Sequence, residues 1–220
     1  MLFDLRGRGR RRTVQVIYLG LAVIMLGGLL LVGVGTGSGG GILNAFTNNG
    51  SGNAQQQVVS QQEKNALRAT RLRPTDPSAW SSLVQARWSS AGQGSDYNST
   101  TGQFTANGKK ELTAATQAWQ RYVQLQKSPD TITATLAARA YSALANFPGE
   151  ATAWEYVTLS NPSQVNAFEC LAASAYAAKQ PRKGDLATAK ALTLVPKAQQ
   201  FQVKQQLSQA KTNPQVAQSC

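Results

Sequence analysis

Apolar residues form one long uninterrupted run near the N-terminus of this chain and only short, spaced groups after it. The run covers residues 14–34, which are 21 residues without a single charge. A helix of this length rises about 31 Å, which matches the hydrocarbon core of a bilayer, about 30 Å thick. We therefore expect residues 14–34 to form one transmembrane helix.

The charges on the two sides of this run predict its orientation. Residues 1–13 contain five arginines and one aspartate, whereas residues 35–53 contain no charge. Positive residues beside a first hydrophobic helix are retained in the cytoplasm. We expect residues 1–13 to be a basic cytoplasmic tail and the C-terminal domain to lie outside the cytoplasm.

A cleavable signal peptide is the alternative interpretation of the same run. The apolar stretch is longer than the roughly 7–15 apolar residues of a signal peptide, and no clear Ala-x-Ala-like site follows it. Residues 36–41 include small side chains, however, so cleavage stays open as an alternative. Residues 35–53 are rich in Gly, Ser and Asn, which is typical of a flexible linker.

From residue 54 onward, apolar positions recur three and four residues apart, the spacing of one helix face. Proline and glycine are confined to the breaks. Six of the expected helices cover residues 54–73, 111–127, 131–146, 150–159, 164–179 and 198–211. Two more are expected to begin at a capping aspartate: one starts at Pro77 after Asp76, and the other runs from Asp185 to residue 195. Residues 92–108 are expected to be a loop. We interpret it as a tolerated insertion, although long loops are often functional.

The breaks and several side chains repeat at a regular interval. Pro129, Pro162 and Pro196 are almost evenly spaced. The group Leu136, Ala137, Ala140 and Tyr141 recurs with the same internal spacing as Leu171, Ala172, Ala175 and Tyr176. Two helices in about 34 residues, with a proline after the second, are typical of the tetratricopeptide repeat. On these residues, segment 77–196 resembles the tetratricopeptide-repeat family.

The chain departs from the family pattern in two places. The long loop replaces the glycine between the helices of the first unit, and Ala137 and Ala138 stand where Leu and Gly are usual. The resemblance implies an all-α fold, in which one transmembrane helix is followed by an α-solenoid of tetratricopeptide-like helix pairs over residues 54–211. Residues 212–220 would then be a C-terminal tail.

Stacked helix pairs of this kind leave a concave groove that is lined by the first helix of each pair. With the repeat phase given above, the groove would present Gln85, Arg139, Asn166 and Tyr176. Arg139 has the clearest chemistry, because a guanidinium group in a groove can hold a carboxylate. An ordinary solvated arginine is the alternative, and the Lys/Asn/Arg set with which some family members bind a C-terminal carboxylate is absent.

Net charge narrows the range of partners. The chain carries 22 Lys and Arg against 10 Asp and Glu, a formal net charge of +12, of which +8 belongs to the residues after position 13. A basic domain is attracted to anionic surfaces such as lipid headgroups or acidic polymers. No dense basic run with interleaved aromatic residues follows the N-terminus, so we expect no nucleic acid partner.

Composition also argues against catalysis. The chain has no histidine, which excludes Ser-His-Asp catalysis and histidine-ligated zinc. The sequence shows no paired carboxylates on one helix face, glycine-rich phosphate loop or metal-ligand cluster. We therefore expect no catalytic residues, no metal, no cofactor and no small-molecule substrate, with an enzyme of unfamiliar type as the remaining alternative.

The two cysteines, Cys170 and Cys220, both follow the expected transmembrane helix. Outside the cytoplasm, an even number of cysteines indicates a disulfide, here one that would tie the tail to the last repeat. Two alternatives stay open: Cys170 as a small buried hydrophobe, and Cys220 paired with another chain.

These observations lead to one functional prediction and one alternative. We expect a single-pass protein of the bacterial cell (inner) membrane whose extracytoplasmic repeats bind other proteins. This layout resembles ancillary subunits of the bacterial export translocon, which implies a role in the assembly or quality control of exported proteins. The alternative is a structural tether that binds an anionic envelope polymer or lipid surface through its basic domain.

Overall fold

The computed structural model describes residues 51–220, with side chains from residue 56 onward, and this part of the chain is almost entirely helical. The α-helices are α3 (Ser51–Leu72), α4 (Pro77–Ala91), α5 (Ala106–Leu125), α6 (Thr131–Ala143), α7 (Phe147–Ser160), α8 (Val165–Ala177), α9 (Pro181–Leu194) and α10 (Lys197–Ala210). The expected cytoplasmic tail, transmembrane helix and most of the linker lie outside the described residues. None of the helices within 51–220 has both the length and the apolar character needed to cross a bilayer.

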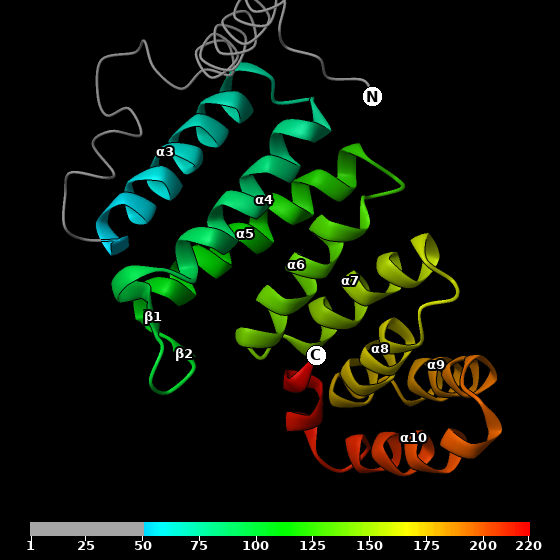
Figure 1. Cartoon of the computed structure of the whole chain (residues 1–220). Coiled ribbons are helices and arrows are strands. Elements are labelled where there is room, and N and C mark those ends of the chain that lie inside the picture. The colour runs from blue at the N-terminus through cyan, green and yellow to red at the C-terminus, as the bar shows by residue number, and fades with distance from the viewer. Residues whose placement is uncertain (1–50) are drawn as a thin grey trace, which may run out of the picture. The chain divides into compact units, whose positions relative to one another are not determined.

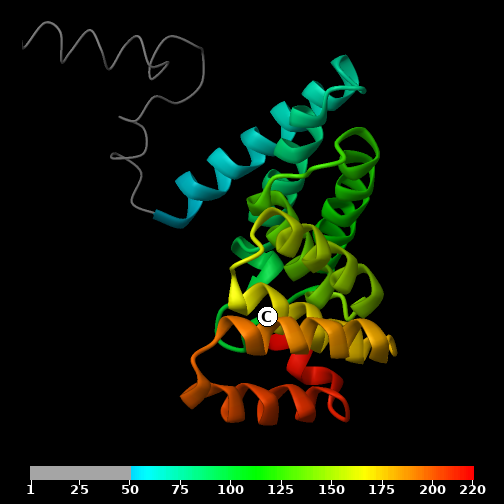
Figure 2. The same cartoon turned by 90° about the vertical axis from the view of Figure 1, so that its right-hand side faces the viewer.

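Consecutive helices pack as antiparallel pairs, and the pairs stack on one another. The pairs are α4 with α5, α6 with α7 and α8 with α9, and further contacts join α5 to α6 and α7 to α8 (Figure 1). Helix α10 packs on α8 and α9 at the C-terminal end of the stack (Figure 2). The all-helical fold expected for this part of the chain is therefore confirmed.

The second half of the domain repeats itself in structure. Helix α8 follows α6, and α9 follows α7, at the same interval of about 34 residues. In both pairs a tyrosine of the first helix packs flat against a glycine in the first turn of the second. A Cβ atom at Gly149 would lie 2.6 Å from the ring of Tyr141, and one at Gly184 would lie 2.4 Å from the ring of Tyr176. Glycine is thus required at both positions for the helices to approach.

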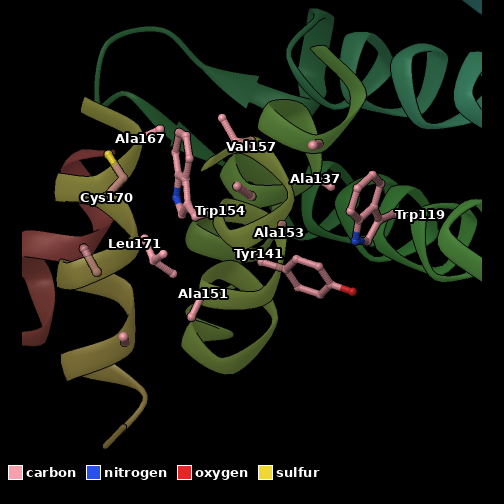
Figure 3. Close-up of a cluster of buried hydrophobic side chains, with 14 of the residues drawn as sticks. Trp119, Ala137, Tyr141, Ala151, Ala153, Trp154, Val157, Ala167, Cys170 and Leu171 are labelled. Carbon is pink, nitrogen blue, oxygen red and sulfur yellow. The ribbon is translucent and has the colours of Figure 1, made fainter. Parts of the chain in front are cut away.

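The core between these pairs is built from alanines and a few large aromatic rings. Trp119, Tyr141 and Trp154 are nearly fully buried, and most of their neighbours are buried alanines. Figure 3 shows Trp154 in the space between α7 and α8, with Leu171 pointing toward it. Each such ring removes roughly 150–250 Å² of surface from water. Small alanines let the helix backbones come close, and the rings fill the remaining space.

Several helix starts differ from the sequence prediction. Asp76 caps α4 as predicted, because its side chain accepts a hydrogen bond from the backbone N–H of Ser78. However, residues 147–149 and 181–184, predicted as breaks, are the first turns of α7 and α9. A proline early in a helix is favourable, since the N–H it lacks has no partner there. Asp185, predicted as a cap, lies inside α9.

The predicted loop 92–108 is shorter and more ordered than expected. It contains a 3₁₀ turn, Gly94–Asp96, and a small antiparallel hairpin of β1 (Tyr97–Asn98) and β2 (Gln103–Phe104). Helix α5 already begins at Ala106, capped by the side chain of Thr105. The predicted tail is also ordered: Pro214–Ser219 form the 3₁₀ helix η2, which packs on α6, α8 and α10.

Candidate binding sites

The four residues predicted to share a groove lie in separate places. Gln85 donates hydrogen bonds to Ser81 and Thr133 at 3.4 and 3.3 Å, so it links α4 to α6, and it also borders an open hollow between α3 and α4. Arg139 lines a different cavity, at the end of α6. Asn166 is exposed in the first turn of α8. Neither of these two hollows is lined by more than one of the four side chains.

Tyr176 is buried rather than groove-lining. Its hydroxyl donates to Asp185 at 2.8 Å, and Lys211 both pairs with Asp185 and lies 4.9 Å above the tyrosine ring. Hydrogen bonds from Lys211 and Tyr176 lower the pKa of Asp185. Tyr176, Asp185 and Lys211 thus connect the C-terminal end of α10 to α8 and α9, so Tyr176 stabilises the packing of these helices.

An apolar groove lies between α7, α8 and α9, with a volume of about 640 Å³. We refer to it as the α7–α9 groove. Apolar side chains dominate its wall: Tyr156, Leu159, Phe168, Leu171 and Leu186. Leu159 and Leu186 are 78% and 73% exposed, and both line this one groove, so they form a contiguous apolar patch and not isolated exposed side chains. The ion pair of Lys183 with Glu155, at 2.8 Å, borders the groove. The groove is an open apolar surface with charged groups at its edge.

A second cavity, of about 470 Å³, lies at the end of α6, and we refer to it as the α6-end cavity. Trp88 of α4, Phe104 of β2 and Lys109 of α5 line one part of it, and Arg139 and Ser142 of α6 line another. The tail completes the wall through Gln218 and Cys220. The sequence singled out Arg139, but it did not reveal that the hairpin and the tail meet beside it.

The tail is held at this place by a disulfide. Cys170 of α8 and Cys220 are bonded, with their Cα atoms 5.6 Å apart. The hydroxyl of Ser142 also donates to the carbonyl of Ala217 at 3.4 Å. The C-terminal segment therefore lies beside the ends of α6 and α8 (Figure 1).

A buried glutamate lies near the same end of the molecule. Glu150, in the first turn of α7, is fully buried, and within the described residues neither carboxylate oxygen has a hydrogen-bond partner. Burial raises the pKa of Glu150 to about 8, and the nearby Trp154 and Ser142 offset this only in part. Neither of these two neighbours makes a hydrogen bond of good geometry to it. The side chain is therefore mainly protonated at neutral pH.

A partly buried ion cluster joins the first three described helices. Arg87 of α4 pairs with Glu63 of α3 at 2.9 Å and also with Glu111 of α5. Ser90 donates a further hydrogen bond to Glu63 at 2.7 Å. All three charged side chains are no more than 24% exposed, so the cluster stabilises the packing of α3, α4 and α5, and the guanidinium of Arg87 is fully paired within the protein.

Chemical groups for metal binding do not converge in the described part of the chain. Within residues 51–220, no group of three or more His, Cys, Asp or Glu side chains could hold a metal ion.

In comparisons with known proteins, no protein family matches the chain, and no curated protein has a significantly similar sequence. Function must be argued from the two surfaces described above.

Proposed function

We propose that the chain is a membrane-anchored module of tetratricopeptide-like repeats that binds other proteins outside the cytoplasm. In this proposal residues 14–34 are the anchor and the α7–α9 groove is the binding surface. The observation that carries it is the exposure of Leu159 and Leu186 on a groove of about 640 Å³. Contiguous exposed apolar surface of this kind marks interaction sites in soluble domains.

The charge of the segment that contains α9, one wall of the groove, bears on the chemistry of the partner, since the two charged residues that line the groove itself, Lys183 and Glu155, are paired with each other. Residues 179–211 contain seven Lys and Arg but only one acidic residue, Asp185. A partner segment that matches this surface has apolar side chains for the groove and acidic residues beside them. An apolar segment of an exported protein before it folds has this character, so the proposed role is assistance in assembly or quality control of exported proteins.

Site-specific photo-crosslinking in the native membrane tests this proposal. A photoreactive amino acid replaces Leu186 in the groove or, as a matched control, Phe201, which is 78% exposed on α10 outside the groove. We expect the Leu186 position to capture exported or translocon proteins at apolar segments flanked by acidic residues. Equal capture from both positions, or capture of no protein, would contradict the proposal.

Binding to an anionic envelope polymer or lipid surface is the second candidate function. The same cluster of seven basic residues in 179–211 favours it. Salt separates the two candidates, because the Debye length shrinks to a few Å, about 3 Å at 1 M salt. Binding of a protein segment in the groove should survive about 0.5 M salt, whereas binding to anionic vesicles should be lost.

A further inference from the structure

The α6-end cavity has features that the protein-binding groove does not share. Its walls come from segments that are far apart in the sequence: the end of α4, strand β2, the first turn of α5, the end of α6 and the tail. Its volume of about 470 Å³ lies within the range of about 300–1,000 Å³ that is usual for small-molecule sites.

The charged side chains of the cavity are both cationic. Arg139 and Lys109 line it, no aspartate or glutamate does, and within residues 56–220 neither cation makes an ion pair, either with an acidic side chain or with the terminal carboxylate of Cys220, which also lines the cavity. Arg87 provides a contrast within the same domain, because it forms ion pairs with both Glu63 and Glu111. An arginine without a protein carboxylate is free to bind the carboxylate of a ligand through two parallel hydrogen bonds.

Part of the cavity wall is aromatic. Trp88 and Phe104 line it, with ring centroids 6.0 Å apart, and Tyr97 supports Phe104 through an edge contact at 5.1 Å. Tyr97 on the neighbouring strand of the hairpin thus packs against the ring of Phe104 and restricts its position. Flat apolar groups pack well against such rings, in offset or edge-to-face arrangements.

We propose that the α6-end cavity binds a small organic anion with a flat apolar body, of the class of aromatic carboxylates. Arg139 and Lys109 hold the carboxylate, while Trp88 and Phe104 contact the ring. The amide of Gln218 lies in the tail wall and completes the polar side. This function is separate from protein binding in the α7–α9 groove.

The cavity also depends on the oxidation state of the cysteines. Cys220 forms part of the wall, and its disulfide with Cys170 keeps the tail against α8. Reduction frees the tail from this constraint. We therefore expect the reduced protein to bind the anion more weakly than the oxidised protein.

Isothermal titration calorimetry on the full chain in detergent micelles tests the proposal with 3-phenylpropionate as the probe. Its amide, 3-phenylpropionamide, lacks the charge, and propionate lacks the ring. We expect 3-phenylpropionate to bind at least tenfold more tightly than either control compound. Equal binding of the acid and the amide, or of the acid and propionate, would overturn the proposal, as would no detectable binding of 3-phenylpropionate at millimolar concentration.

Variants separate the cavity from nonspecific binding to the protein or the micelle. Arg139→Gln should weaken binding of 3-phenylpropionate at least tenfold, and Cys220→Ser or reduction should weaken it several-fold. Arg68→Gln, at an exposed arginine of α3 that does not line the cavity, should leave binding unchanged. An equal loss in Arg139→Gln and Arg68→Gln, or no loss in Arg139→Gln, would contradict the assignment. Because the α7–α9 groove contains neither arginine, the crosslinking result at Leu186 is independent of this outcome.

Discussion

The two halves of the described domain connect their helices in different ways. In α6–α7 and α8–α9 the helices are joined by three residues, one of which has a left-handed backbone: Ala145 at φ 55° and Lys179 at φ 58°. In α4–α5 the connection is residues 92–105, with a 3₁₀ turn and a hairpin. Yet α4 and α5 still pack along their length. A helix pair therefore tolerates an insertion at its tip, and here the inserted hairpin becomes one wall of a cavity.

The two halves are also stabilised by different forces. The ion cluster around Arg87 joins α3, α4 and α5, whereas α6–α9 depend on close contacts of tyrosine with glycine, alanine-rich packing and a disulfide. A substitution should therefore change the free energy of unfolding by an amount that depends on whether it removes an ion pair in the first half or a close packing contact in the second. Four predictions follow this difference, from the largest expected effect to the smallest.

The buried Glu150 should make the stability of the C-terminal half depend on pH. The pKa of Glu150 is about 8 in the folded protein, against the usual value of 4.5 in the unfolded chain, so the folded state binds the proton more tightly. Stability should therefore fall as the pH rises from about 5 to about 8. Relative to wild type, Glu150→Gln should gain about 4 kcal/mol of unfolding free energy between about pH 5 and pH 9.

Urea denaturation at pH 5, 7 and 9 measures this difference. The matched control is Glu155→Gln on the same helix, where the carboxylate is 43% exposed and paired with Lys183. Its stability relative to wild type should change little with pH. Parallel pH profiles for wild type and Glu150→Gln would show that Glu150 is not buried as a neutral acid.

The Cys170–Cys220 disulfide should make the second largest contribution to the free energy of unfolding. It closes a loop across a sequence separation of 50 residues. Loss of a cross-link over a loop of about 50 residues costs about 4 kcal/mol in the chain-entropy model. Cys220→Ser should lower the unfolding free energy by about this amount under oxidising conditions. Peptide mass spectrometry without reduction should detect the Cys170–Cys220 link in wild type, and two free thiols would refute it.

The glycines under the tyrosine rings should tolerate no side chain. Gly149→Ala and Gly184→Ala place a methyl group into the rings of Tyr141 and Tyr176, so each should lose about 2–3 kcal/mol of stability. Gly92→Ala is the matched control in the other half, because its nearest neighbour would be 3.8 Å from the added atom. Thermal unfolding of the three variants measures the difference. A similar loss at Gly92 would mean that contact with the tyrosine rings does not determine the effect.

The ion cluster around Arg87 should contribute less to the free energy of unfolding than the tyrosine–glycine contacts do, but more than an ion pair at the surface. Arg87→Leu leaves Glu63 and Glu111 facing each other in a partly buried place, and we expect a loss of about 2 kcal/mol. Lys183→Leu breaks the more exposed pair with Glu155 and should cost less than about 1 kcal/mol. Chemical denaturation of both variants tests the order, which an equal loss would contradict.

Much of the helical pattern could be predicted because its signals are local. The Asp76–Pro77 cap acts within one helical turn, and Pro129, Pro162 and Pro196 each act locally in a connection between two helices. The errors of the prediction are local too, since Pro148 and Pro181 are expected in breaks although each lies in the first turn of a helix. A proline is compatible with either role, and only the packing of the following turn decides between them.

The candidate sites were less predictable, because they depend on contacts between distant parts of the chain. The place of Arg139 in a repeat unit identifies it as a candidate from sequence alone. Phe104 and Gln218, which line the same cavity, belong to the hairpin and the tail, and no sequence pattern connects them with Arg139. Nothing in the local sequence around Glu150 indicates that its carboxyl group is buried. Its burial became visible only when α6 and α7 were packed together.

The sequence by itself determined the helical class of residues 51–220, the regular repeat of helix pairs and the positions of most breaks, because propensity, capping and periodicity act over a few residues. The tertiary structure alone decided that the insertion folds into a hairpin, that the tail packs against α8, that Gln85 and Arg139 line different hollows and that Tyr176 is buried. These features arise from the packing of side chains that are distant in sequence, which no local pattern encodes.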